Sequence, residues 1–190
     1  MSIVSVALMI GAGAMLAYPA YTNFLSDRTQ DRLDREIASP EIKQAYQEGE
    51  LTDGDPLTRI KIPAIDVETV VVEGTSGSAL RAGAGHYPST PLPCEAGNVG
   101  IAGHRTTYGR PFNNLDRLKL GDTIILTTPV GTCTYEITKG PWITHPRDFS
   151  VVANDPSVKV LTLTTCHPKG SAKQRLIVQA TLVQGAGERA

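Results

Sequence analysis

Residues 158–183 read VKVLTLTTCHPKGSAKQRLIVQATLV and contain the two clearest strand patterns in the chain. The first pattern, Val158–Thr165, and the second, Arg175–Val183, are rich in apolar and β-branched residues, as strands of a buried sheet are. Pro168 ends the first strand because its nitrogen has no hydrogen to donate to a neighbouring strand. The segment between the two strands is short enough to fold back on itself.

Stretches with a similar strand pattern recur upstream, separated by short turns rich in glycine and proline. They are 57–62, 67–72, 98–102, 122–128 and 132–144. Residues 112–120 form the one stretch of this region that is predicted to be a short helix. Many short strands without long intervening helices are typical of an all-β barrel or sandwich. We therefore predict an all-β domain over residues 51–190.

The composition agrees with one globular domain and an appendage. The chain has 190 residues, of which 41% are hydrophobic, and its 18 glycines and 13 prolines favour turns. A net charge of -1 gives no electrostatic basis for binding nucleic acid. Three cysteines are too few for a disulfide framework. The composition also excludes a disordered chain, a coiled coil and a protein with several membrane spans.

The first 26 residues carry no charged side chain. Residues 3–25 read IVSVALMIGAGAMLAYPAYTNFL, which is long enough for a membrane-spanning helix. We therefore predict a transmembrane anchor at 1–26. A cleaved signal peptide is disfavoured because the apolar run is long and has no basic region before it. A core helix is disfavoured because it rarely lacks a polar face. The missing basic flank also suggests that Met1 is not the native first residue.

Residues 27–50 contain eleven charged residues, seven acidic and four basic. Asp31 and Arg35 lie four positions apart, a spacing that weakly supports an exposed helix. Pro40 ends this helix or begins another. We predict a charged juxtamembrane stalk at 27–50 that acts as a solvated spacer and carries no chemistry.

Three residue types that suit acyl transfer occur at strand ends. Cys166 ends one strand, Arg175 begins the next, and His104 follows the strand at 98–102. A cysteine thiolate is a nucleophile that a nearby cation stabilises. Histidine can protonate a leaving amine, and arginine can hold an oxyanion or a substrate carbonyl. Convergence of the three would form an acyl-transfer site, whereas the alternative for Cys166 is a buried, inert thiol.

Several separated motifs resemble those of sortases, the cysteine transpeptidases of Gram-positive cell envelopes. TLTTC at 162–166, followed by Arg175, resembles the sortase signature, and NVGIAGHR at 98–105 resembles the segment that holds the catalytic histidine. GHYPSTPLP at 85–93 and GRPFNNLDRLKLGD at 109–122 extend the likeness across the domain. Within the family, the motifs TLTTCHP, GHYP and AGHRTTYG are most similar to class E sortases of actinobacteria.

The resemblance implies a closed eight-stranded sortase-like β-barrel with short helices, preceded by the transmembrane helix. It implies that Cys166 is the nucleophile, His104 the general acid and base, and Arg175 the stabiliser of an oxyanion or of the substrate. The reaction would cleave a LAXTG-like or LPXTG-like sorting signal between threonine and glycine through a thioacyl-enzyme. Partners would be secreted proteins with a C-terminal sorting signal and an amine of a peptidoglycan precursor or a pilin. The protein would cross the cell membrane once, with the N-terminus inside and the catalytic domain outside.

The predictions for the residues around Cys166, His104 and Arg175 are weaker. Candidate substrate-binding residues, each with an alternative structural role, are Thr165, Arg105 and Tyr108. His167 is expected to point away from Cys166, because neighbours on an extended chain face opposite ways. His86 and His145 lie beside turns that contain proline and are expected at the surface.

No metal and no cofactor are predicted. The chain has no CxxC or HxxxH spacing for zinc and no glycine-rich loop with phosphate-binding spacing. Asp148 and Asp155 fall where some sortases bind calcium, but two acids do not support a site. Cys94 and Cys133 depart from the pattern of the family. A disulfide between them is permitted in an exported domain, and the sequence leaves it open.

Two other functions stay open. One is a peptidoglycan L,D-transpeptidase, whose usual Ser-His-Gly-Cys motif is absent here. The other is a membrane-tethered binding domain that has lost activity, and the retention of all three catalytic residue types argues against it. Cleavage of a sorting peptide would separate these functions from that of a sortase.

Overall fold

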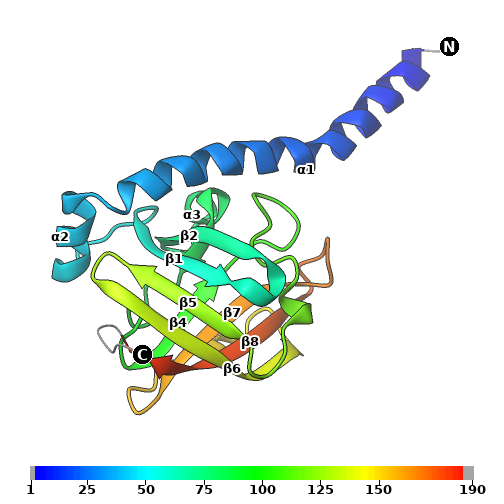
Figure 1. The fold of residues 1–190 in the computed structure, drawn as a ribbon. Coiled ribbons are helices and arrows are strands. Elements are labelled where there is room, and N and C mark those ends of the chain that lie inside the picture. The colour runs from blue at the N-terminus through cyan, green and yellow to red at the C-terminus, as the bar shows by residue number, and fades with distance from the viewer. Residues whose placement is uncertain (1–2, 186–190) are drawn as a thin grey trace.

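The computed structural model describes residues 3–185 and forms a closed barrel of eight strands beneath one long helix (Figure 1). The strands are β1 Pro56–Ile62, β2 Val67–Glu73, β3 Ala84–His86, β4 Gly97–Ala102, β5 Thr123–Thr128, β6 Gly131–Thr144, β7 Lys159–His167 and β8 Gln174–Gln184. The helices are α1 Ile3–Glu36, α2 Pro40–Glu48 and α3 Gly77–Ala82, with short 3-10 turns η1 Pro63–Ile65, η2 Leu115–Arg117 and η3 Phe149–Val152. The expected closed eight-stranded barrel is confirmed.

Around the barrel the strand order is β1-β2-β3-β4-β7-β8-β6-β5, and β5 closes the ring by pairing with β1. Aliphatic side chains of all eight strands, including Ala84 of β3, meet inside together with the buried ring of Tyr135. Burial alternates along β5, because successive side chains of a strand point to opposite faces. The alternation of apolar and polar residues along such a strand therefore indicates which side chains point into the barrel and which point outward.

Two pairings bring distant segments to one end of the barrel. β4 runs parallel to β7, with Ala102 opposite Thr164, so the carboxyl ends of both strands lie side by side. β7 runs antiparallel to β8, with Cys166 opposite Arg175. The topology therefore gathers the end of β4, the end of β7 and the start of β8 at one rim.

Two details of the domain differ from the expectations. The strand β3 and the helix α3 were not expected, and β3 inserts between β2 and β4. The expected helix at 112–120 is wrong, since only the single 3-10 turn η2 forms there. Phe112, Leu115 and Leu118 are all buried in the core. Their spacing of three also suits one face of an α-helix, which is why the sequence of this stretch predicts one.

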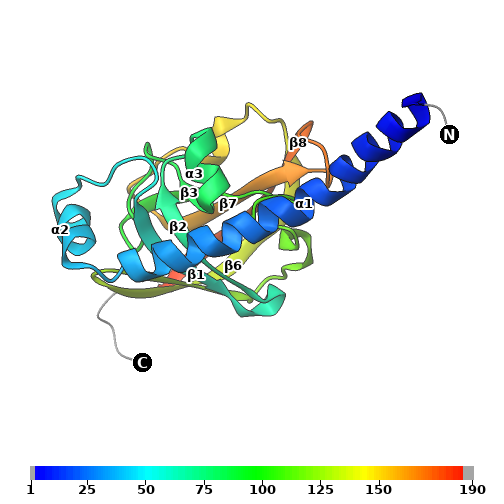
Figure 2. The ribbon, with the colours of Figure 1, turned by 90° about the horizontal axis from the view of Figure 1, so that it is seen from above.

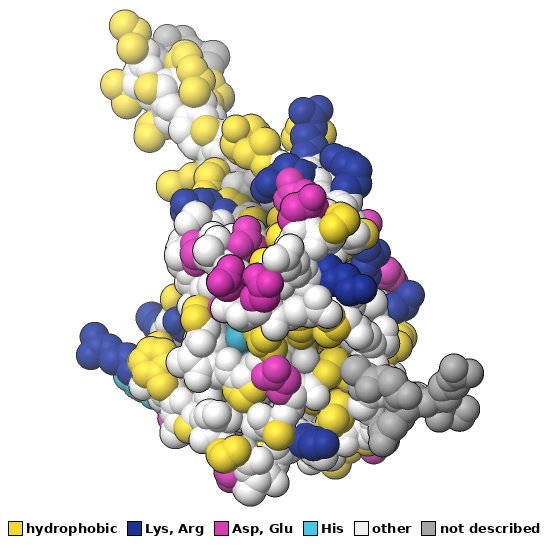
Figure 3. Space-filling model, turned by 90° about the vertical axis from the view of Figure 1, so that its left-hand side faces the viewer, with side chains coloured by type: hydrophobic (Ala, Val, Ile, Leu, Met, Phe, Trp, Pro, Cys, Tyr) yellow, Lys and Arg dark blue, Asp and Glu magenta, His cyan; other side chains and the backbone are white. Residues whose placement is uncertain are grey.

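The helix α1 is one continuous element through the expected anchor and into the expected stalk. Its apolar first part is exposed and projects beyond the body of the molecule, as Figure 3 shows. This part is long and apolar enough to cross a membrane. The second part lies across the barrel beside α3 and β2 (Figure 2).

The expectation that residues 27–50 form a solvated spacer is wrong. Leu33 is completely buried and Ile37 is nearly so, and both pack against Val70 and Val72 of β2. Leu33 and Ile37 lie four positions apart, so they form one apolar stripe on an otherwise charged segment. The helix α2 is also attached, because the buried Tyr46 hydroxyl donates to the Pro93 carbonyl.

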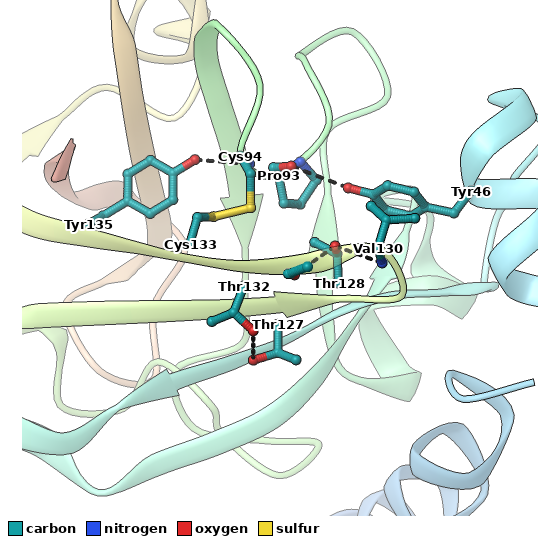
Figure 4. Close-up of a disulfide and its surroundings, with 10 residues drawn as sticks. Tyr46, Pro93, Cys94, Thr127, Thr128, Val130, Thr132, Cys133 and Tyr135 are labelled. Carbon is teal, nitrogen blue, oxygen red and sulfur yellow. Dashed lines mark hydrogen bonds between the residues drawn. A yellow bond between two sulfur atoms is a disulfide. The ribbon is translucent and has the colours of Figure 1, made fainter. Parts of the chain in front are cut away.

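A disulfide joins Cys94, in the loop after β3, to Cys133 of β6 (Figure 4). The Cα atoms are 5.7 Å apart, a normal separation for this bond. The Cys94 amide also donates to the hydroxyl of Tyr135 at 3.1 Å. Burial raises the pKa of Tyr135 to about 12, which keeps this hydroxyl neutral. The question that the sequence left open is therefore settled in favour of a disulfide.

Candidate active site

Cys166, His104 and Arg175 come together at the rim where β4, β7 and β8 meet. All three line one cavity of about 200 Å³, whose other walls come from Tyr87 just after β3, from α3 and the segment before it, and from the ends of β4 and β7. A second cavity of about 210 Å³ is lined by His104, Cys166 and the loop between β7 and β8. The thiol and the imidazole therefore stand between two hollows, one on each side.

The ends of β4 and β7 are joined through Gly103, the residue before His104. Its amide donates to the Thr164 carbonyl, and its carbonyl accepts from the Thr165 hydroxyl at 2.7 Å. A side chain at Gly103 would lie 2.6 Å from the ring of Phe112, so only glycine fits. These bonds fix where His104 leaves its strand relative to Cys166.

Arg175 is placed by strand register. It lies directly opposite Cys166 in the antiparallel pair, and such neighbours point to the same face with Cβ atoms roughly 4.5–5.5 Å apart. The guanidinium is held by its own loop, since Nη1 donates to the Ala172 and Gln174 carbonyls at 3.2 Å each. The register therefore puts the guanidinium on the same face of the sheet as the thiol.

His104 is half-buried, and its ring lies 5.0 Å from the ring of Tyr108. Burial lowers the pKa of His104 below its usual value, and the positive charge of Arg81 lowers it further. Both effects disfavour the imidazolium. The imidazole of the free chain is therefore mostly neutral at pH 7, a form that can take a proton from a thiol.

His167 faces away from this pair, as expected. In β7 it lies opposite Gln174, one position beyond the Cys166–Arg175 pair. Its Nδ1 lies 2.9 Å from Nη1 of Arg105. Because arginine only donates, Nδ1 is the acceptor and the ring proton is on Nε2. His167 is therefore used to hold its own strand end.

The three candidate substrate-binding residues have structural contacts. Arg105 lines the second cavity, but its side chain is only 4% exposed and its guanidinium contacts the Cys166 carbonyl, His167 and Asp116. Thr165 lines the first cavity with its hydroxyl donating to Gly103. The hydroxyl of Tyr108 pairs with that of Tyr18, on α1.

His86 was expected at the surface, and this is wrong. It is 1% exposed, and its Nδ1 lies 2.8 Å from Oε2 of Glu73, its register partner on β2. Its Nε2 lies 3.0 Å from the Thr90 hydroxyl. The error follows from the missed strand β3, which places His86 inside the barrel wall. His145 is exposed, as expected.

Tyr87 is a cavity residue that the sequence reasoning did not assign. It lines the first cavity, and its hydroxyl lies 3.0 Å from that of Thr164. Leu80 and Thr75 form the same wall from outside the recognised motifs. Of these three residues, only Tyr87 could have been assigned to the site from the sequence, because it belongs to the GHYP stretch at 85–88.

Asp148 and Asp155 act as turn caps. Asp148 accepts hydrogen bonds from Ser150 and Thr144, and these bonds lower its pKa. Asp155 accepts from the amide and hydroxyl of Ser157, which lower its pKa in the same way. Within residues 3–185 no group of three or more His, Cys, Asp and Glu side chains is placed to hold a metal.

Comparison with known proteins gives consistent matches. Sortase SrtE1 of Streptomyces coelicolor is 33% identical over 150 residues, covering 72% of this chain and 43% of the relative. Sortase D of Bacillus subtilis is 36% identical over 122 residues, covering 63% of this chain and 60% of the relative. The chain thus spans about half the length of these relatives.

Solved structures of sortases also match this chain. A Clostridium perfringens sortase D5 transpeptidase matches with a TM-score of 0.72 at 33% identity, over 83% of this chain and 98% of that one. Sortase E from Streptomyces avermitilis matches with a TM-score of 0.65 at 36% identity, over 73% and 97%. The expected likeness to sortase E proteins is confirmed, and the likeness to sortase D proteins is of the same order. The sortase domain model matches residues 60–183, and this chain therefore belongs to the sortase family.

Proposed function

We propose that this chain is a cysteine transpeptidase that cleaves a LAXTG-like or LPXTG-like sorting signal between threonine and glycine. The observation that carries the proposal is the shared cavity of Cys166, His104 and Arg175. The proposal is supported by the strand register, which puts Cys166 and Arg175 on one face, and by the parallel pairing of β4 with β7, which brings His104 to the same rim.

In the first half-reaction, His104 takes the thiol proton and Sγ of Cys166 attacks the carbonyl carbon of the threonine. The carbonyl electron pair moves onto oxygen, where Arg175 donates hydrogen bonds to the oxyanion. When the pair returns, the bond to the glycine nitrogen breaks. His104 gives its proton to that nitrogen, so the amine leaves and a thioester of Cys166 remains.

In the second half-reaction, an amine from a peptidoglycan precursor or a pilin attacks the thioester. It loses a proton to His104, a new amide forms as the bond to sulfur breaks, and Sγ of Cys166 takes that proton back from His104. The two cavities suit these two half-reactions. The first, walled by Leu80 and Tyr87, suits an apolar peptide segment. The second, beside the Ser171 loop, offers a separate approach for the amine.

We place the enzyme at the cell membrane, with α1 crossing it once, the N-terminus inside and the barrel outside. The exposed apolar part of α1 and its length support the span. The disulfide supports an oxidising location for the barrel, because such bonds persist mainly outside the reducing cytoplasm. Secreted proteins with a C-terminal sorting signal are the proposed partners.

The test uses the full chain in detergent micelles with fluorogenic LAXTG and LPXTG peptides and an added amine. We expect cleavage between threonine and glycine, an acyl adduct on Cys166 by mass spectrometry, and a transfer product. Replacing the exposed His145 serves as a matched control for the His104 variant. Turnover of peptidoglycan stem peptides alone would favour an L,D-transpeptidase, and peptide binding without any adduct would favour a silent binding domain.

A further inference from the structure

The loop that carries His104 contains an unusual turn. Tyr108, Gly109 and Arg110 have φ angles of +53°, +74° and +44°, so three consecutive residues are left-handed. Two of them are not glycine, and such residues persist in this conformation only where the surroundings impose it. The turn therefore depends on neighbours that hold it in place.

The helix α1 supplies those neighbours. The hydroxyls of Tyr18 and Tyr108 are 2.8 Å apart. The Gly109 amide donates to Oδ1 of Asn23 at 3.0 Å. The approach is close, because a Cβ on Gly109 would lie 2.7 Å from Oγ of Ser26. Consecutive residues of the turn are thus bonded to side chains from successive turns of one helix.

The turn at 108–110 also contacts the imidazole of His104. The ring of Tyr108 lies 5.0 Å from that of His104, at an interplanar angle of 40°. Farther along the loop, the Phe112 amide donates to the His104 carbonyl at 3.1 Å. Tyr108 therefore stands between α1 and His104, with its hydroxyl bonded to the helix and its ring against the imidazole.

The helix is fixed to the barrel independently of these bonds. The side-chain amide of Gln30 accepts from the Val70 amide and donates to the Ala82 carbonyl. Leu33, one turn farther on, is completely buried. Loss of the Tyr18 or Asn23 contact therefore leaves α1 docked, and the effect of each contact on the loop can be measured separately.

We propose that Tyr18 and Asn23 are positioning residues for His104, so that the end of the apolar stretch of α1, where it reaches the barrel, sets the geometry of the acid–base. This inference rests on the proposed function, because it assigns His104 that role. It also means that the anchor helix and the catalytic loop form one unit.

The test compares Tyr18→Phe and Asn23→Ala with the control Tyr21→Phe in the full chain in micelles. Tyr21 is on the same helix with its side chain exposed, so its hydroxyl serves as the reference. We expect each test variant to lower kcat by roughly two- to tenfold with KM unchanged, the range that one hydrogen bond spans. The control should stay at the wild-type rate. Tyr108→Phe should match Tyr18→Phe, and the double variant should be no worse than either alone.

Hydrogen exchange at the Gly109 amide gives a readout that needs no turnover. It should be faster in Asn23→Ala and unchanged in Tyr21→Phe. Test variants with wild-type kcat, or an unchanged Gly109 amide in Asn23→Ala, would overturn the inference while leaving the proposed function standing. A wild-type chain that cleaves no sorting peptide would overturn the proposed function and the catalytic part of this inference together.

Discussion

Reduction of the Cys94–Cys133 disulfide is expected to destabilise the barrel strongly. The bond joins residues 39 positions apart, so it removes much of the freedom of the unfolded chain. The chain-entropy relation for a loop of about 40 residues gives roughly 3.9 kcal/mol at 25 °C. This is a large share of the usual free energy of unfolding of a domain, about 5–15 kcal/mol.

The assay is urea unfolding of the full chain in micelles, followed by the fluorescence of Trp142 with and without a reducing agent. For a slope near 2 kcal/mol per molar urea, the midpoint should fall by roughly 2 M on reduction. The double variant Cys94→Ala/Cys133→Ala should behave like the reduced wild type and be insensitive to the reducing agent. Cys166→Ala controls for reduction of other thiols and should keep the full difference. A shift below about 0.5 M would refute the loop-entropy reasoning.

The other predictions concern the cavity residues. Cys166→Ala should abolish cleavage and transfer and leave the unfolding midpoint nearly unchanged, whereas cleavage by this variant would disprove the mechanism. His104→Ala should lower kcat/KM far more than His167→Ala, and the reverse order would exchange their roles. Arg175→Lys should lose at least about tenfold in kcat, because lysine keeps the charge but not the planar fork of donors; near-wild-type turnover would leave Arg175 only as a charge. Arg81→Gln should raise the pKa of His104 and move the acid limb of the kcat/KM profile to higher pH, since removing a positive charge favours the imidazolium; an unmoved limb would show that burial alone sets this pKa.

The strands of the barrel other than β3 could be predicted from the sequence because each is a local pattern. The runs that became β7 and β8 carry their own apolar and β-branched signal, and the end of β7 at His167 follows from Pro168. The strand β3 has only three residues, too few for any pattern to show. Because this strand was not predicted, His86 was wrongly expected at the surface.

The sequence predicted the three residues that share the candidate cavity but not the walls of that cavity. Cys166, His104 and Arg175 each stand in a motif or at a strand end. Tyr87 and Leu80 reach the cavity through the pairing of β3 with β2 and through α3, which are long-range facts. The docking of α1 was missed for a similar reason, because Leu33 and Ile37 are two apolar residues among many charges and gain meaning only opposite β2.

The continuous α1 has a consequence for how the enzyme meets its substrates, if the helix spans the membrane as proposed. A barrel on a flexible tether would sweep a volume above the bilayer, and its cleft would face every direction in turn. A barrel bonded to its own anchor has one height and one tilt. Encounters then become collisions within a plane, between partners that diffuse in the same membrane. The scissile bond must be presented at the height of the rim, so the length of the segment between a sorting signal and its membrane anchor would decide which proteins are processed.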